Sequence, residues 1–153
     1  MTAEPLGIVE LVDVCHSMQR RNAAVFAWLG TIVTHGEAGT NGRLFAEACH
    51  RHAWHAELWA ARRPTIPVGP TAAPAGTEDG GDDDGGDDDG GDPVGAYRAE
   101  VDALRSMVRE LASRVDRDLD PGTLRVIDLV AADLESLDDR LAAPSVSGSS
   151  RNS

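Results

Sequence analysis

The stretch YRAEVDALRSMVRELASRV, residues 97–115, decides the fold class, because its apolar side chains recur in alternating steps of four and three. The positions are Tyr97, Val101, Leu104, Val108, Leu111 and Val115. Such a heptad pattern draws one apolar seam along a helix that packs against other helices. It predicts a helix from about Ala96 to Leu119, which must bury its seam against another apolar surface.

The residues that follow predict an antiparallel neighbour for this helix. Asp120 is a favourable N-cap, and Pro121 is typical of the first helical position. A second apolar stripe follows and stops before Pro144; its members are Leu124, Ile127, Val130, Leu134, Leu137 and Leu141. Because the connection is short, the two helices should form a hairpin over residues 96–143. Residues 144–153 are predicted to be a disordered polar tail.

The N-terminal residues 1–63 predict a second hairpin. A helix from about Leu6 to Val33 carries one apolar face, made of Ile8, Leu11, Cys15, Met18, Asn22, Val25, Phe26 and Leu29. A glycine-rich turn follows, and another helix runs from about Gly42 to Arg62. At 100° per residue its inner side comprises Phe45, Ala48, Cys49, His52, His55, Ala56 and Trp59. Trp28 and Trp54 fall opposite these stripes, which makes them candidates for a partner surface.

Residues 64–95 are predicted to be a disordered linker between the hairpins. The segment changes from a Pro/Ala/Gly-rich stretch to GGDDDGGDDDGGD at residues 80–92, which has no apolar side chain to bury. Nine acids lie within residues 78–92, and without them the net charge of −12 would be about −3. An acidic linker repels phosphate, so composition argues against nucleic-acid binding.

Together these patterns predict an all-α protein, a four-helix up-down bundle in which the two hairpins bury each other's stripes. The alternative is that one hairpin pairs with its own copy, as in a homodimer of two N-terminal hairpins. The apolar stretch 23–33 is too short to span a membrane, and the N-terminus lacks the pattern of a signal peptide. The predicted compartment is therefore the cytoplasm, where the two cysteines are expected to be reduced. All fourteen cations are Arg, which together with abundant Ala, Gly and Asp indicates a GC-rich, actinobacterial type of genome.

The second helix holds the residues that could carry metal chemistry. His52 and His55 are one turn apart on the apolar face, so both imidazoles could reach one transition-metal ion. Cys49 is a possible third ligand, and the first helix could add two more; the full candidate set is His52, His55, Cys49, His16 and Cys15.

The competing interpretation of the same residues is structural. Interior histidines are usually satisfied by hydrogen bonds, here with Asn22, Gln19 or a backbone carbonyl, and buried cysteines pack as small apolar groups. The C-terminal hairpin is expected to contribute only aliphatic side chains around the two imidazoles. No nucleophile elbow, phosphate-binding loop or dinucleotide fingerprint occurs, so no catalytic residue is predicted.

Two stretches give the chain a family resemblance: RNAAVFAWLG at residues 21–30 and RHAWHAELWAARRP at residues 51–64. They resemble the ferritin-like superfamily, in its uncharacterised actinobacterial branch, over about residues 6–67. In that branch the second helix ends in an acid-x-x-His-Ala-acid pattern, then Trp and an Arg-x-Pro exit. His55, Ala56 and Glu57 stand on the His-Ala-acid part, and His52 stands where the first acid is expected.

The resemblance implies a ferritin-like bundle, and the departures imply that its di-iron site is incomplete. His52 replaces an acid, the first helix has no inward Glu because Glu10 points outward, and residues 96–143 contain no histidine. Hard carboxylate ligands are thus too few for two iron ions. The sequence therefore predicts a structural or protein-interaction module rather than an enzyme, with a protein partner or self-association. The alternative is a metal-binding protein or metalloenzyme using the His/Cys site on the second helix.

Overall fold

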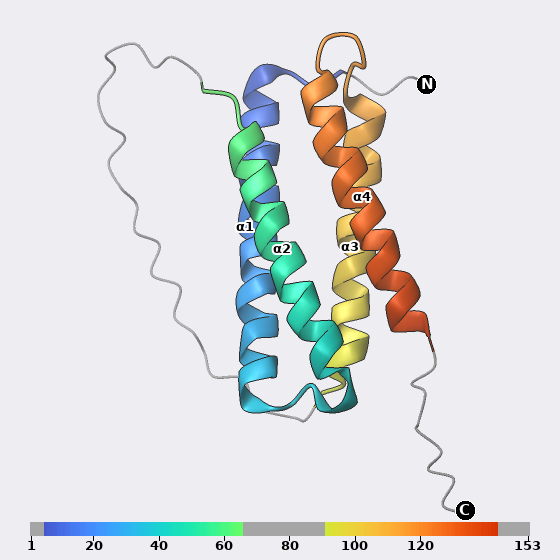
Figure 1. Ribbon diagram of the computed structural model, residues 1–153. Coiled ribbons are helices and arrows are strands. Elements are labelled where there is room, and N and C mark those ends of the chain that lie inside the picture. The colour runs from blue at the N-terminus through green and yellow to red at the C-terminus, as the bar shows by residue number, and fades with distance from the viewer. Residues whose placement is uncertain (1–4, 66–90, 144–153) are drawn as a thin grey trace, which may run out of the picture.

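The computed structural model describes residues 5–65 and 91–143, which form four long helices in two hairpins (Figure 1). The elements are α1 (Ile8–His35), a short 3₁₀ helix η1 (Gly39–Asn41), α2 (Gly42–Arg62), α3 (Pro93–Arg114) and α4 (Pro121–Ala142). α1 packs against α2, α3 against α4, and the two hairpins meet mainly between α2 and α4. The predicted all-α class with two hairpins is confirmed. Most of the predicted disordered linker and tail lies outside the described residues.

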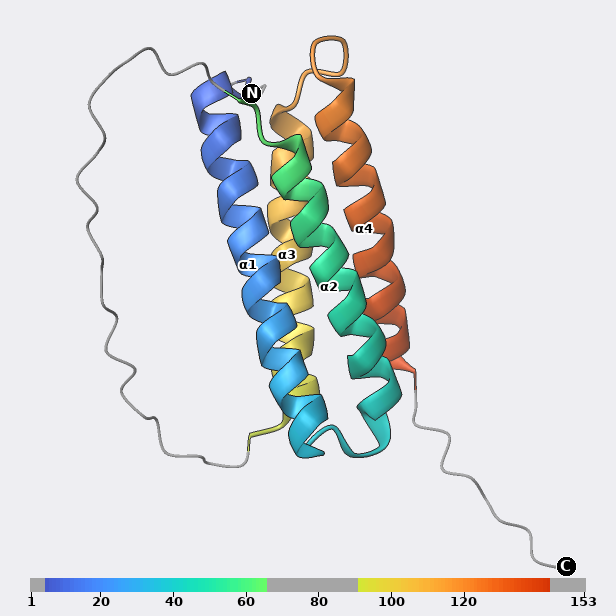
Figure 2. The same cartoon turned by 60° about the vertical axis from the view of Figure 1, so that its left-hand side comes forward.

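Two contacts at one end of the bundle fix the helix directions. The Leu6 N–H donates to the carbonyl oxygen of Arg114, so α1 begins where α3 ends. Arg62, the last residue of α2, binds Asp120 at the start of α4. Each hairpin is therefore antiparallel, whereas α2 and α3 run in the same direction (Figure 2). The end of α2 and the beginning of α3 consequently lie at opposite ends of the bundle.

The start of α3 differs from the prediction. The helix begins at Pro93 rather than Ala96, because Asp92 caps it by accepting a hydrogen bond from the Val94 N–H at 3.0 Å. The same Asp-Pro signal starts α4, where Asp120 accepts from the Thr123 N–H at 3.0 Å, as the sequence predicted. The dipeptide at residues 92–93 is therefore the start of a helix, although the linker was predicted to extend to residue 95.

The end of α3 also differs, since the helix stops at Arg114 and not near Leu119. The Asp116 carboxylate accepts hydrogen bonds from the backbone N–H groups of Asp118 and Leu119, at 2.8 and 3.2 Å. A short Asp side chain that binds its own following backbone competes with helix formation and favours a turn. Leu119 is 84% exposed in that turn, so it belongs to the α3–α4 loop.

The turn after α1 is a glycine cap. Gly36 has a φ of +75°, the left-handed conformation that favours glycine, and follows His35 directly. Its N–H donates to the carbonyl of Val33, and the Glu37 N–H donates to that of Ile32. These bonds satisfy carbonyl groups at the helix end and reverse the chain towards η1.

The core of the bundle is mostly aliphatic, and the aromatic side chains of Trp59, Tyr97 and Phe45 are fully buried in it. Trp28 and Trp54 remain 36% and 41% exposed, as their positions predicted. The buried stripe of α1 steps by four and three through Leu11, Cys15, Met18, Asn22, Val25, Leu29 and Ile32. No helix of the described residues is long and apolar enough to cross a bilayer.

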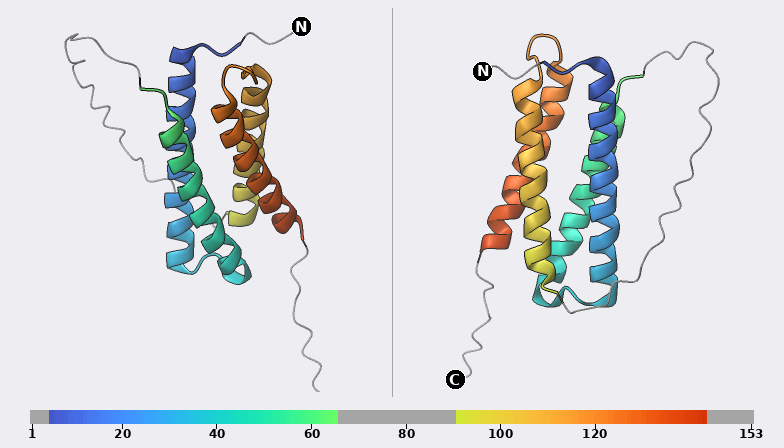
Figure 3. Two further views of the ribbon diagram at one scale, coloured as in Figure 1. Left: turned by 45° about the horizontal axis from the view of Figure 1, so that its top comes forward. Right: turned by 180° about the vertical axis from the view of Figure 1, so that it is seen from behind.

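The prediction that Phe26 and Ile8 lie on the inner face of α1 is wrong, since Phe26 is 45% exposed and Ile8 is 63% exposed. The buried stripe passes through Val25, and the next residue along a helix lies about 100° further round. This step turns Phe26 out of the bundle. Seen from behind, α1 and α3 lie side by side (Figure 3). Fewer of their residues are in contact than in the α1–α2, α3–α4 and α2–α4 pairs.

Candidate functional site

A buried polar network lies at the middle of the bundle, with members from all four helices. His52 and His55 of α2 are both 0% exposed, and their ring centroids are 5.7 Å apart. Asn22 comes from α1, Tyr97 from α3 and Asp133 from α4. Helical spacing turned both imidazoles inward, as the sequence predicted, and tertiary packing supplied the other members.

His52 uses both of its ring nitrogens. The Asn22 amide nitrogen donates to the Met18 carbonyl at 2.9 Å, so its oxygen is the atom that faces Nδ1 of His52, at 2.8 Å. Nδ1 must therefore carry the proton and donate to Asn22. The other nitrogen, Nε2, is left as an acceptor for the Tyr97 hydroxyl at 2.9 Å. The network thus selects one neutral tautomer of His52.

Burial controls the protonation of this pair. Desolvation, helped by the neighbouring His55, lowers the pKa of His52 to about 3. Burial likewise raises the pKa of the Tyr97 hydroxyl above its usual value. The imidazole and the phenol are therefore both neutral over the physiological range, and their contact is an ordinary neutral hydrogen bond.

His55 binds a carboxylate on α4. Its Nε2 lies 3.1 Å from Oδ2 of Asp133, while Oδ1 of the same carboxylate accepts from Arg51 at 2.9 Å. Burial lowers the pKa of His55, and the hydrogen bond to Asp133 partly opposes that shift. With the Nε2 proton directed at Asp133, the neutral ring leaves Nδ1 as an acceptor. That atom is buried and has no hydrogen-bond partner in the part of the chain that the structure describes.

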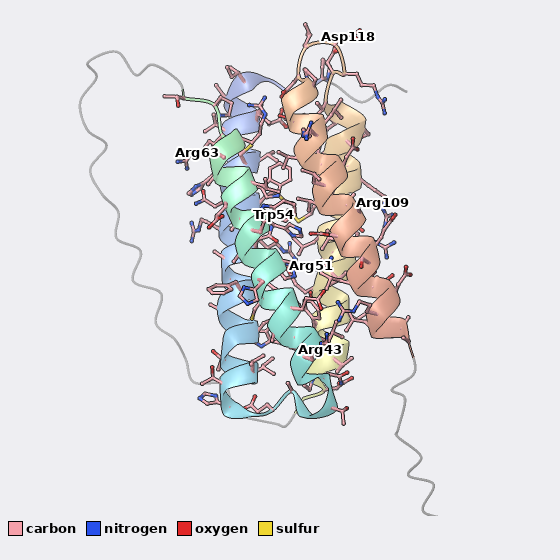
Figure 4. All side chains as sticks on the ribbon, viewed as in Figure 1. Arg43, Arg51, Trp54, Arg63, Arg109 and Asp118 are labelled. Atoms are coloured by element: carbon pink, nitrogen blue, oxygen red, sulfur yellow. The ribbon has the colours of Figure 1, made fainter. Side chains whose placement is uncertain are left out.

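Arg51 links the buried network to the surface between α2 and α4 (Figure 4). Besides Asp133 it binds Glu47 at 3.0 Å, and Glu47 also accepts from Arg140 of α4 at 2.5 Å. Both arginines lower the pKa of Glu47 through these hydrogen bonds. Glu47 thus joins Arg51 of its own helix to Arg140 of α4.

The two cysteines are packed, unpaired thiols. The Cys49 thiol donates to the carbonyl of Phe26 on α1 at 3.6 Å, and burial raises its pKa. Burial also raises the pKa of Cys15, on which the charges of Arg62 and Asp120 act in opposite directions. Neither environment favours the thiolate, which is the form that binds metals and attacks substrates.

The structure brings some of the predicted metal ligands together and separates others. His52 and His55 are neighbours, and Cys49 lies one turn before them. His16 is exposed instead, and its Nδ1 lies 3.3 Å from a guanidinium nitrogen of Arg63. Across residues 5–65 and 91–143, no three His, Cys, Asp or Glu side chains are grouped so that they could hold a metal ion.

A metal site on these five residues therefore stays a prediction, and metal binding there would break hydrogen bonds that the structure shows. An ion on His52 would have to displace its hydrogen bond to Asn22 or to Tyr97 and leave that group unsatisfied. The free nitrogen of the pair is Nδ1 of His55. A transition metal usually needs at least two further protein ligands beside such a nitrogen.

The expectation that the C-terminal hairpin offers only aliphatic side chains to the imidazoles was wrong, because Tyr97 and Asp133 both bind them. Tyr97 opens the seam of α3, where its hydroxyl needs a partner once buried. Asp133 continues the four-and-three spacing of Val126, Val130 and Leu137 on α4. This position in the apolar seam of α4 was the signal in the sequence that Asp133 faces a polar partner inside the bundle. The expected Asn22 contact is confirmed, whereas the Gln19 side-chain oxygen has no hydrogen-bond partner within residues 5–65 and 91–143.

A surface groove of about 410 Å³ lies between α1 and α3. Its lining residues are Arg21, Ala24, Val25, Trp28, Ala96 and Glu100. Arg21 and Glu100 close one side through two contacts, at 2.6 and 3.0 Å. The remaining lining is apolar, and the ring of Trp28 lies 6.3 Å from the buried Tyr97 ring.

Comparison of the chain with protein-family models, curated proteins and solved structures found no match.

Proposed function

We propose that this chain is a structural or protein-interaction module built on a ferritin-like bundle that lacks a complete di-iron site. The observation that carries the proposal is the use of both His52 ring nitrogens by Asn22 and Tyr97. In this arrangement the imidazole is a polar link between α1, α2 and α3. Satisfied buried networks of this kind fix the register of helices and specify one packing arrangement.

The helix directions support the ferritin-like part of the proposal. The hairpins are antiparallel, while α2 and α3 run in the same direction, so that α2 ends at the opposite end of the bundle from the start of α3. One end-to-end connection between two hairpins is the chain order of ferritin-like bundles. The half-buried carboxylates Glu100 and Asp133 are engaged by Arg21, Arg51 and His55 rather than directed at a common centre.

The interaction surface in this proposal is the outer face of α1, which we define as Ala23, Phe26, Ala27, Trp28, Gly30, Thr31 and Thr34. Residues 22–34 contain no charged side chain, although the chain as a whole carries a net charge of −12. Phe26 and Trp28 stay 45% and 36% exposed there, and the groove beside α3 continues the apolar surface. Exposed apolar surface rimmed by polar residues is typical of protein-binding sites.

Site-specific photo-crosslinking of the full chain in cells tests this function. A benzophenone amino acid at Trp28 should give protein adducts, because that side chain lies on the proposed surface. The matched control is Leu129 on α4, which is 39% exposed but lies outside the outer face of α1. Adducts at both positions alike, or at neither, would contradict the proposed surface.

The rival function is a metal-binding protein, and the free buried Nδ1 of His55 favours it. Elemental analysis of the full chain, purified without added metal, tests it. Stoichiometric Zn, Fe, Cu or Ni that is lost in the His55→Gln variant would support the rival and contradict the purely structural role. The unpaired thiols of Cys15 and Cys49 fit the reducing cytoplasm, which is the compartment that we propose.

A further inference from the structure

We propose that the partner on the outer face of α1 is a second copy of this chain, bound through an antiparallel α1–α1 contact with two-fold symmetry. This inference rests on the proposed function, in which that face is an interaction surface. Three observations lead to it: the spacing of residues on the face, the charges at its two ends, and a glycine without an internal role.

The spacing gives α1 a second helical seam. Arg20, Ala23, Ala27, Gly30 and Thr34 follow one another in steps of three and four, the period of a seam between packed helices. These positions are each five residues after a member of the buried stripe, and five residues correspond to about 140° round the helix. The bundle buries one stripe and leaves the other exposed or half-exposed.

The charges at the ends of this seam favour an antiparallel copy. A two-fold axis between Ala27 and Gly30 sets Ala23 against Thr34 of the partner subunit. Arg20 then comes to the C-terminal end of the partner's α1, where Glu37 of the partner subunit follows the helix. The negative end of a helix dipole and a carboxylate both attract a guanidinium. The symmetry makes this contact twice.

Within one chain these charged groups are weakly engaged. Arg20 is exposed and has no ion pair among the described residues. The Glu37 carboxylate lies 3.9 Å from His35, and both side chains are about 60% exposed. Between the two ends the face has no charge to desolvate, so two copies of an acidic chain can approach there without burying like charges.

Gly30 supports a close approach of another helix. It lies inside α1, where glycine is less favourable than alanine, and its φ is not in the left-handed region. Apart from the backbone of its own helical turns, no atom of the described residues would lie within 4 Å of a Cβ at this position. Internal packing therefore does not require glycine here. A helix packed on this face would require it, because a missing side chain lets two helix axes come close together.

The size of the seam sets the strength of the contact. From Arg20 to Thr34 it extends about 21 Å along α1, at about 1.5 Å per residue. One helix pair of that length gives an interface smaller than the roughly 800 Å² per partner of stable complexes. We therefore expect an exchanging dimer with a dissociation constant of about 10 to 100 µM.

Sedimentation velocity of the full chain over a concentration series tests the proposal. Arg20→Glu and Glu37→Arg should each weaken dimerisation about tenfold, because either change replaces two attractive contacts by two repulsive ones. The double variant should restore it to within about threefold of the natural chain. Arg125→Glu on α4, also an exposed position, is the matched control and should leave the dimer unchanged.

Circular dichroism of each variant checks that the bundle is folded. A chain that stays monomeric up to about 1 mM would overturn the proposal. So would a dimer that neither reversal weakens, or a double variant as weak as the single ones. Failure here is distinct from failure of the proposed function, because adducts between Trp28 and a different protein would support an interaction module without self-pairing.

Discussion

Lowering the pH from about 7 to about 5 should destabilise the bundle through His52. The ring is neutral in the folded state, where burial holds its pKa at about 3, whereas an unfolded chain restores the ordinary value of 6.5. Between these two values the unfolded state binds a proton that the folded state does not. Stability conferred by the neutral ring is therefore complete above the unfolded pKa and is lost as the pH falls.

The expected magnitude follows from the two pKa values. Where the His52 ring is protonated in the unfolded state but not in the folded state, each pH unit lowers the free energy of unfolding by about 1.4 kcal/mol. Between pH 7 and the unfolded pKa of 6.5 this loss is still small. His52 by itself should therefore lower the free energy of unfolding by about 2 kcal/mol between pH 7 and 5. His55, whose pKa is also lowered, adds to the loss with the same sign.

Urea unfolding at pH 7, 6 and 5, followed by far-UV circular dichroism, measures this dependence. The natural chain is compared with His52→Gln, which removes the titrating ring, and with His50→Gln as control, since His50 is exposed on the same helix. The His52 variant should show a clearly shallower decline with falling pH, and the His50 variant should follow the natural chain. Equal declines in all three proteins would refute the reasoning.

Three further predictions concern single side chains. Tyr97→Phe should cost about 1 to 3 kcal/mol in urea unfolding, because Nε2 of His52 loses its donor inside the core; an unchanged midpoint would contradict the hydrogen bond between Tyr97 and His52. Asp133→Asn should lower the pKa of His55 further, since the carboxylate opposes the effect of burial. An NMR titration of the His55 ring measures this pKa, and a higher pKa in the variant would contradict the prediction. Gly30→Ala should raise the free energy of unfolding of the monomer by about 0.5 to 1 kcal/mol, because it adds helix propensity into open space, while a loss of stability in dilute solution would reveal a hidden contact.

The helices themselves were largely predictable from local signals. α2 runs from Gly42 to Arg62 as expected, and Asp120 and Pro121 start α4 as expected. The errors lie at the two ends of α3, where short-range hydrogen bonds of Asp92 and Asp116 compete with the apolar pattern. Patterning identifies which residues need burial, but an Asp side chain decides within a turn where a helix begins or ends.

The candidate site was predictable only in part. Helical periodicity turned His52 and His55 inward, and Asn22 was among the expected partners because α1 and α2 are joined by a short turn. Tyr97 and Asp133 were missed, since they are 45 and 78 residues from the rings that they bind. The exposure of Phe26 was missed too. Val25 and Phe26 are neighbouring apolar residues, and the sequence pattern does not tell which of them lies on the buried stripe of α1.

The sequence by itself determined four helices, their pairing into two hairpins and the side of α2 that faces inward. These follow from repeat spacing, caps and connection length, which act over a few residues. The tertiary structure alone decided how one hairpin is rotated and shifted against the other. That rotation brings Tyr97 and Asp133 to the imidazoles and leaves the outer face of α1 uncovered. Its physical basis is side-chain packing between segments far apart in the chain, which no local pattern encodes.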